Sequence, residues 1–352
     1  MKILLTSILF FFHTVYSYAQ WQPDFRLTTD PSSSFLSYNN AHCLAVDGDN
    51  LHVVWWDGRD LDREIYYNHS TDNGLTWQQD KRLTNSPGWS EYPSIAVSGL
   101  NVHIVWMDDR DESFYPEIYY KHSVDGGQSW SADEKLTSNP SDPGIPSLAV
   151  SGNNVHIVWH DIRDGNWEIY YKRSTDNGLT WQTDVRLTND VSVSERASIA
   201  MWDSKIYIVW QDERDNDKEI YFKYSTDNGA NWSGDVRLVN SVGESEAPTL
   251  AVEESNINVV WSDSRNGIGN GEVYFKKSTD AGLNWSEDIR VTNTPVASGR
   301  PSIALSSNFV HISWNEVWEI YYTRSTDAGI SWETETRITN NSSDSQNSFI
   351  AT

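Results

Sequence analysis

Six copies of one short motif, Ser-x-Asp-x-Gly-x-x-Trp, divide this chain of 352 residues into repeats. Their aspartates are Asp72, Asp125, Asp176, Asp227, Asp280 and Asp327, which lie 53, 51, 51, 53 and 47 residues apart. Self-similarity at such a period predicts that each repeat is one supersecondary unit, and that neighbouring units stack to bury a shared core. We therefore expect one repeat domain over residues 20–352.

Each repeat contains four short runs that are typical of β-strands. Strand A is of the Pro-Ser-Ile-Ala-Val type (93–97), strand B ends in a tryptophan such as Trp106, strand C begins with a glutamate such as Glu117, and strand D carries Arg-Leu-Thr (82–84). The runs are β-branched and aromatic, and Gly, Asn and Asp clusters separate them. Four strands per repeat of this length predict an all-β fold, a β-propeller with one four-stranded blade per repeat.

The ends of the chain leave the number of blades open. Residues 21–28 match a strand D, and the end of the chain, through Ile350 and Ala351, matches the start of a strand A. Six complete repeats favour a six-bladed ring. A seven-bladed ring whose last blade is incomplete is the alternative, although two strands do not form a full blade and would leave an exposed edge.

Residues 1–19 are typical of a secretory signal peptide. Lys2 supplies the positive start, residues 3–12 are apolar, and Ser17 and Ala19 form a small-x-small motif for cleavage before Gln20. The apolar run is too short to span a bilayer, so we expect no membrane span. The protein is predicted to be secreted, periplasmic or at the cell surface.

Charge and composition exclude several classes of partner. Acidic residues (50) outnumber Lys and Arg (26), for a formal net charge of −24, whereas nucleic-acid binding requires a basic surface. A single cysteine rules out a disulfide framework or a Cys-rich zinc site. No phosphate loop and no calcium loop of EF-hand type occurs, so we predict no metal and no cofactor. The oligomeric state stays open.

Length variation is confined to one loop of each repeat. From the strand-B tryptophan to the strand-C glutamate the steps are 9, 11, 9, 9, 11 and 5 residues, while the rest of the repeat keeps its length between the first and last boxes. In a propeller the B–C and D–A loops share one face. This face tolerates change without disturbing the core, and is therefore the expected site of binding.

Arginines, carboxylates and tryptophans recur in the loops of that face. The candidate ligand-binding residues are Arg59, Arg110, Arg163, Arg214 and Arg265 of a Trp-x-Asp-x-Arg pattern, Glu91, Glu195 and Glu246 of Ser-Glu pairs, and Trp56, Trp89 and Trp167. A guanidinium binds a carboxylate through two hydrogen bonds, and concave aromatic surfaces suit ligands. An anionic sugar, as part of a glycan or polysaccharide, is a coherent ligand. The alternative is structural, because a repeated Asp-x-Arg often staples a loop or pairs two blades.

The Ser-x-Asp-x-Gly-x-x-Trp box has the chemistry of a turn. Its Asp accepts backbone N–H groups, its Gly allows positive φ, and its Trp covers apolar surface, so we assign the six aspartates a structural role. The boxes resemble the Asp-box (bacterial neuraminidase) repeats of the sialidase superfamily over residues 21–352. The resemblance implies the propeller fold, and it is less specific for activity, because glycosidases and non-enzymatic propellers share the box.

Sialidases, as the resemblance implies, use three arginines on the substrate carboxylate, an acidic acid/base residue, and a tyrosine nucleophile paired with a glutamate. Here Arg26 lies in a strand-D motif, Arg300 lies at the start of a strand A, and the strand-C tyrosines recur in every repeat, so the catalytic residues stay unassigned. We expect a secreted glycan-binding propeller. One alternative is an exo-acting glycoside hydrolase of sialidase type, and another is a structural or adhesion module of a larger surface protein.

Overall fold

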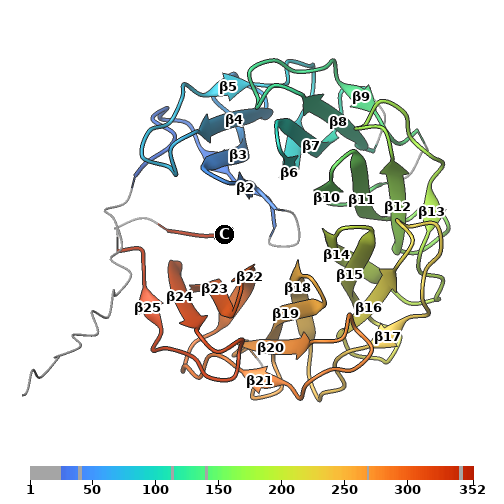
Figure 1. Cartoon of the computed structure of the whole chain (residues 1–352), viewed down its shortest axis with the longest axis vertical. Helices are drawn as coiled ribbons and strands as arrows, with labels where there is room; N and C mark the ends of the chain where they lie inside the picture. The colour runs from blue at the N-terminus through green and yellow to red at the C-terminus, as the bar shows by residue number, and fades with distance from the viewer. Residues whose placement is uncertain (1–24, 39–41, 112–114, 139–141, 268, 341–343) are drawn as a thin grey trace, which may run out of the picture.

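The chain forms a ring of six antiparallel sheets (Figure 1). The computed structural model describes residues 25–38, 42–111, 115–138, 142–267, 269–340 and 344–352. These sheets confirm the predicted all-β propeller with six four-stranded blades. The predicted signal peptide, residues 1–19, lies outside the described residues.

Each blade follows the order A, B, C, D from the axis outward. In the first blade strand A is split into β1 (Ser34–Phe35) and β2 (Leu44–Asp47), which both pair with β3 (Asn50–Asp57), followed by β4 (Glu64–Ser70) and β5 (Lys81–Arg82). The second blade is β6 (Ser90–Ser98), β7 (Asn101–Asp108), β8 (Glu117–Ser123) and β9 (Glu134–Lys135). The third is β10 (Ser147–Ser151), β11 (Asn154–Asp161), β12 (Glu168–Ser174) and β13 (Val185–Arg186).

The remaining three blades repeat the pattern. The fourth is β14 (Ser194–Trp202), β15 (Lys205–Asp212), β16 (Glu219–Ser225) and β17 (Val236–Arg237). The fifth is β18 (Ser245–Glu253), β19 (Asn256–Asp263), β20 (Glu272–Ser278) and β21 (Ile289–Arg290). The sixth is β22 (Ser298–Ser306), β23 (Phe309–Glu316), β24 (Glu319–Ser325) and β25 (Thr336–Arg337).

The middle strands are apolar along both faces because each blade is packed between two neighbours. In β11, Val155, Ile157 and Val158 are all fully buried, although alternate residues of a strand point to opposite faces. The buried clusters accordingly combine residues of adjacent blades, such as Tyr171 of the third with Ile208 of the fourth. A run of consecutive apolar residues is the pattern that this double packing requires.

The Asp-box closes the turn between strands C and D. Asp176 accepts hydrogen bonds from Ser174 Oγ at 2.6 Å and from the backbone N and Oγ1 of Thr180 at 2.9 and 2.5 Å. These donors, those of Ser174 and Thr180 foremost, lower the pKa of Asp176 to about 2. The Asp176 carboxylate therefore stabilises the turn in which it lies.

The box also sets the contact between blades. Trp181 of the third blade packs edge-on against Tyr120 of the second, with ring centroids 4.8 Å apart. Gly178, at φ +80°, lies against the same tyrosine, because a Cβ there would stand 1.9 Å from its hydroxyl oxygen. Four of the other five boxes likewise place Trp130, Trp232, Trp285 and Trp332 on the equivalent ring of the preceding blade. The glycine and the tryptophan of the box are thus fitted to the neighbouring blade.

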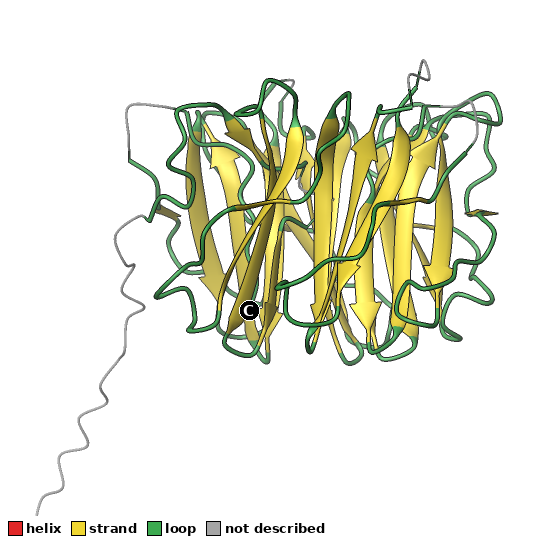
Figure 2. Ribbon diagram, turned by 90° about the horizontal axis from the view of Figure 1, so that it is seen from above, coloured by secondary structure: helices red, strands yellow, loops and turns green. Residues whose placement is uncertain are grey.

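The loops divide between two faces of the ring (Figure 2). The box turn is bonded to the A–B turn, as Asn177 N donates to Asn153 O at 2.8 Å, and the D–A loop is bonded to the B–C loop, as Ser194 N donates to Trp167 O at 2.8 Å. We call these the box face and the loop face. The variable loops and the boxes are therefore on opposite faces. No helix in the described part of the chain is long and apolar enough to cross a membrane.

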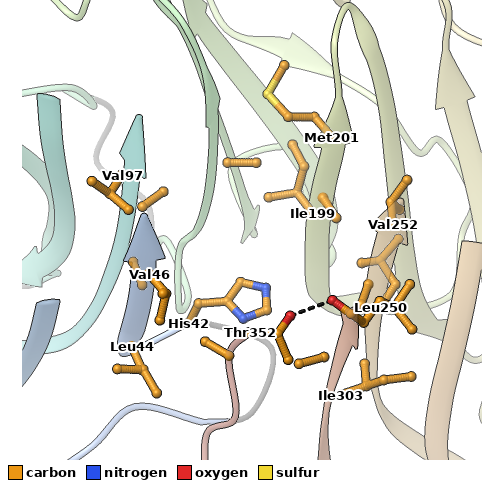
Figure 3. A pocket seen from close by; sticks show the side chains of 18 of the residues that line it. His42, Leu44, Val46, Val97, Ile199, Met201, Leu250, Val252, Ile303 and Thr352 are labelled. Atoms are coloured by element: carbon orange, nitrogen blue, oxygen red, sulfur yellow. Dashed lines mark hydrogen bonds between the residues drawn. The ribbon is translucent and has the colours of Figure 1, made fainter. Parts of the chain in front are cut away.

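The inner strands line an axial channel of about 510 Å³, shown in Figure 3. The last residues of the chain line it too, between β22 and β2 (Figure 1). Asn347 N donates to Asn315 Oδ1 at 3.1 Å and Ile350 N to Ser302 Oγ at 3.2 Å. Arg300 N makes the same kind of contact with Ser262 Oγ of the blade before it, at 3.1 Å. The trailing strand-A match therefore occupies a seventh inner position beside six complete blades.

The contact of Gly178 with Tyr120 yields a stability prediction. Gly178→Ala adds a Cβ at positive φ against the tyrosine hydroxyl, and we expect the free energy of unfolding to fall by about 2–4 kcal/mol. Gly152→Ala is the matched control, because φ is +56° there and nothing lies within 4 Å of the added Cβ. Chemical denaturation measures both, and equal losses would show that the contact between blades contributes nothing.

Candidate functional site

The five arginines of the Trp-x-Asp-x-Arg pattern lie within their own blades. In the fourth blade Trp210 Nε1 donates to Asp212 Oδ2 at 2.8 Å, and Arg214 Nη2 donates to the same atom at 2.7 Å. Arg214 Nη1 reaches Asp235 of the loop before β17 at 2.8 Å, and its Cζ lies 4.4 Å from the centroid of the Tyr221 ring. We call this set the clamp. Arg59, Arg110, Arg163 and Arg265 form the same clamp in the first, second, third and fifth blades.

The charged groups of the clamp are paired with one another. Burial alone would raise the pKa of Asp212, but hydrogen bonds from Arg214 and Trp210 outweigh it and lower that pKa. Each of the five guanidinium groups meets two carboxylates, and the arginines are spread around the ring one per blade. The structure therefore does not gather them at one point, and their predicted role in binding a ligand stays a prediction.

A substitution separates the two roles of these arginines. We expect Arg214→Gln to lower the free energy of unfolding by about 3 kcal/mol, because it leaves the fully buried Asp212 without its cation. We expect glycan affinity to stay unchanged. Arg324→Gln is the control, since its ion pair with Glu333 is more exposed (side chains 21% and 48%) and is worth about 0.5 kcal/mol. Lost affinity at unchanged stability would restore the ligand role.

A different set of side chains converges on the loop face. Strand A carries a β-bulge in four blades, between Glu91 and Ser94, Glu195 and Ser198, Glu246 and Thr249, and Gly299 and Ser302. The bulged residues Tyr92, Arg196, Ala247 and Arg300 have φ of 51°, 54°, 52° and 51°. Bulges re-aim side chains and recur beside functional sites. Here three of the four bulged residues, Tyr92, Arg196 and Arg300, contact the ring of Tyr38.

Tyr38 stands at the centre of these residues. It lies between β1 and β2, where the first blade has a longer connection in place of the two-residue bulge. The Cζ atoms of Arg196 and Arg300 lie 5.1 and 5.2 Å from the centroid of its ring, and the Tyr92 ring stacks on it at 5.6 Å. We call Tyr38, Tyr92, Arg196 and Arg300 the rim site. The ring brings them together from the first, second, fourth and sixth blades.

The two arginines of the rim site differ in their partners from the arginines of the clamp. Among the described residues neither guanidinium forms an ion pair with a carboxylate, unlike the clamp arginines. Arg300 Nη1 donates to Asn347 Oδ1 at 3.0 Å, and Arg196 N donates to His160 Nδ1 at 3.4 Å. Burial, with the Arg196 charge, lowers the pKa of His160 to about 4, so this histidine is neutral at pH 7. Two cations thus face one small space in an acidic protein.

The space beside these arginines is large enough for a sugar. A cavity of about 690 Å³ is lined by Arg196, Arg300, Glu246 and Ser262, among others. A second cavity of about 390 Å³ adjoins Arg300 and is lined by Asn315 and Trp318. Small-molecule sites have volumes of roughly 300–1,000 Å³.

The three glutamates predicted from the Ser-Glu pairs lie next to the rim site, one residue before each bulged residue. Glu246 accepts a hydrogen bond from Lys218 Nζ at 2.6 Å, and Glu195 accepts one from Gln211 Nε2 at 2.8 Å. Glu91 pairs with Arg63. Burial raises the pKa of the Glu91 carboxyl, and the charge and hydrogen bond of Arg63 oppose this only in part.

The predicted tryptophans are also on the loop face. Trp56 and Trp89 both contact Arg63, whose Cζ is 5.2 and 4.3 Å from the two rings. Trp167 meets His160 edge-on, with centroids 4.9 Å apart. The structure therefore brings Trp56, Trp89 and Glu91 into one group, and places Trp167 beside the histidine that contacts Arg196.

Sequence reasoning selected none of the four residues of the rim site, although it noted Arg300 at the start of a strand A. It followed what the repeats share, whereas Tyr92, Arg196 and Arg300 stand at one position where the repeats differ, just before the Pro-Ser or Ala-Ser of strand A. Tyr38 lies in a segment that no other repeat contains. The signal for these residues in the sequence is a position that differs between the repeats and lies between positions that the repeats share. Within the described ranges no group of three or more His, Cys, Asp or Glu residues is arranged to hold a metal ion.

Comparison with known proteins agrees with the fold. No family model matches the chain. It is 24% identical over 281 residues to a curated sialidase of Clostridium perfringens, and this match covers 69% of the chain and 72% of that protein. The TM-score to the structure of a Hadza microbial sialidase is 0.57 at 17% identity, and the match covers 80% of this chain and 63% of the other.

Two further structures resemble the chain. For the NanB sialidase of Streptococcus pneumoniae the TM-score is 0.54 at 11% identity, with 90% of this chain and 71% of the other covered. For an α-L-arabinanase of Penicillium chrysogenum, complexed with arabinobiose, it is 0.56 at 13% identity, with 81% and 94% covered. Likeness at these identities shows a common fold.

Proposed function

Because this chain is a β-propeller of the sialidase superfamily, we propose that it acts on glycans at the rim site and binds there the carboxylate of an acidic sugar. One observation carries the proposal. Arg196 and Arg300, from the fourth and sixth blades, both face the Tyr38 ring at 5.1 and 5.2 Å without a carboxylate partner among the described residues.

The chemistry of these groups fits an acidic sugar. A guanidinium presents a planar fork of donors that matches a carboxylate, and two of them favour one negative charge strongly. The hydroxyl groups of Tyr38 and Tyr92 can form hydrogen bonds with the hydroxyl groups of a sugar. The protein has a net charge of −24, so an anion is attracted only where cations are concentrated.

The comparisons support a choice of first ligand. The relative found by sequence is a sialidase, and sialic acid is an acidic sugar. The arabinanase structure holds arabinobiose, a neutral sugar, so the fold accommodates other saccharides. The rim site, rather than the fold, favours the acidic ligand. Export through the predicted signal peptide would bring the protein to extracellular glycans.

The proposal predicts the effect of removing either arginine. We expect Arg196→Ala and Arg300→Ala each to weaken binding of methyl α-N-acetylneuraminide about 10- to 100-fold, because each removes one charge-assisted contact worth about 1.5–3 kcal/mol. Isothermal titration calorimetry measures the affinity. Arg324→Ala, on the box face, is the control and should bind as the unmodified protein does. Unchanged affinity in both rim variants would refute the assignment.

Hydrolysis is the second candidate function, and Glu91 favours it. A general acid needs a raised pKa, and burial raises that of Glu91, which adjoins Tyr92 in the chain. A fluorogenic sialoside tests for turnover. If Glu91 donates the proton, we expect Glu91→Gln to lower turnover at least 100-fold and to leave the affinity for the methyl sialoside within about threefold. Absence of turnover in the unmodified protein would leave a binding protein, and absence of binding as well would leave a structural or adhesion module.

A further inference from the structure

Four side chains of the loop face accept a backbone N–H group from the next segment around the ring. They stand directly after the strand-B tryptophan of the third, fourth, fifth and sixth blades, and we call them the acceptor residues: His160, Gln211, Ser262 and Asn315. They bind the backbone N of Arg196, Ala247, Arg300 and Asn347, at 3.4, 3.0, 3.1 and 3.1 Å respectively. Each acceptor residue thus connects its blade to the following blade or, in the sixth, to the trailing segment 344–352.

The residues that donate these hydrogen bonds share one unusual backbone conformation. Arg196, Ala247 and Arg300 are bulged residues of strand A, with φ of 54°, 52° and 51°, and Asn347 has φ of 55°. A bulge leaves its extra residue out of the ladder of hydrogen bonds, and an N–H group that lacks an acceptor away from water is costly. Positive φ is also costly for a residue with a Cβ, and it persists only where the surroundings enforce it. The acceptor residue supplies the missing partner and so favours the bulge.

The first two blades have no such acceptor. The second has Met107 at this position, whose thioether is a weak acceptor, and strand A of the third blade pairs in continuous register from Ser147 to Ser151. The first has Trp56, whose indole only donates, and the bulged residue Tyr92 stacks on Tyr38 instead. An acceptor residue therefore accompanies both arginines of the rim site.

Arg300 is held at both of its ends. Its backbone N donates to Ser262 Oγ of the fifth blade, and its Nη1 donates to Asn347 Oδ1 at 3.0 Å. Asn347 N in turn donates to Asn315 Oδ1 of the sixth blade. The backbone conformation fixes the direction of the Cα–Cβ bond, and the bond to Asn347 fixes the guanidinium, whose Cζ lies 5.2 Å from the centroid of the Tyr38 ring.

Arg196 depends on a neutral histidine. His160 Nδ1 accepts from Arg196 N only while the ring is neutral and carries its proton on Nε2. Burial keeps the ring in this form, because it lowers the pKa of His160 to about 4. The ring is also confined: a Cβ on Gly144 would stand 1.8 Å from its Nε2, and Trp167 meets it edge-on. The histidine therefore presents Nδ1 to the bulge in one fixed orientation.

We propose that Ser262 and His160 are positioning residues for the acidic sugar: each fixes, through the backbone of the bulge, the arginine that the next blade contributes to the rim site. This rests on the proposed function of the rim site. An arginine that is fixed before the ligand arrives loses less conformational entropy on binding. The affinity for the acid is thereby set by the contact between blades as well as by the arginines themselves.

Removing the Ser262 hydroxyl tests the first contact. We expect Ser262→Ala to weaken binding of methyl α-N-acetylneuraminide about 3- to 10-fold in calorimetry, since one neutral hydrogen bond is lost. Ser262→Thr keeps the hydroxyl and should bind within about twofold of the unmodified protein. Ser262 also lines the cavity of about 690 Å³, so a double variant separates positioning from direct contact. In the Arg300→Ala background Ser262→Ala should have no further effect, whereas a direct contact with the ligand would add its own loss.

The chain itself supplies matched replacements for His160. His160→Gln keeps an acceptor, as Gln211 does in the fourth blade, and His160→Met removes it, as Met107 does in the second. Both variants lose the packing of the imidazole, so the difference between them isolates the acceptor. We expect His160→Met to bind the ligand about 3- to 10-fold more weakly than His160→Gln.

Ser147→Ala is the control for a merely structural role. Ser147 Oγ accepts from Ile199 N at 3.4 Å, in the same strand as Arg196, but Ile199 lines the axial channel and not the rim site. This variant should lower the melting temperature and leave the affinity within about twofold. Thermal melts confirm that each variant is folded.

The outcomes separate this proposal from the function on which it rests. Full affinity in Ser262→Ala and His160→Met overturns the positioning role alone, provided that Arg196→Ala and Arg300→Ala still weaken binding. An equal loss in Ser147→Ala also overturns it, because the effect would then be a general loosening of the blades. So does an additive loss in the double variant. Failure of the unmodified protein to bind the methyl glycoside overturns the rim site and the positioning role together.

Discussion

The buried carboxylate of the clamp is the group on which five of the six blades depend. Asp212 is fully buried, and a buried charge without partners is prohibitively costly. Asp212 accepts hydrogen bonds from Trp210 of the same strand and from Arg214 of the loop that follows it. Arg214 also donates a hydrogen bond to Asp235, which precedes the outermost strand. Ser194 of strand A also donates to it at 2.9 Å. One carboxylate thus joins strands A and B to strand D, which explains the recurrence of Trp-x-Asp-x-Arg.

The same requirement determines where function is possible. A clamp arginine that turned from its carboxylates to a ligand would leave a buried charge without its cation, which is costly. The residues free to serve a ligand are those that the repeats do not share. Tyr38, Tyr92, Arg196 and Arg300 are all of this kind, and they meet on the loop face. The repeated scaffold thus carries a loop face whose residues differ from blade to blade.

The fold followed from the sequence because its signals are local. The box motif, the strand-B tryptophan and the strand-C glutamate occur in every repeat, and six copies indicated six blades. The candidate site was harder to predict. The sequence placed Glu91, Trp56 and Trp89 on one face, and the structure brings them into one group, whereas it gave no sign that Arg196 and Arg300 would meet at Tyr38. The rim-site residues occupy positions that differ between the repeats, and a search for repeated motifs does not select such positions.

The sequence by itself determined the blade, since hydrogen bonds such as that between Ser174 and Asp176 join residues two apart and need no distant partner. It also determined that one face varies, through the unequal B–C loops. Only the tertiary structure decided which residues meet. Tyr38, Arg196 and Arg300 are more than 100 residues apart in sequence, and no local pattern relates them. They meet because the ring closes around an axis and because the bulges turn one residue of strand A toward it.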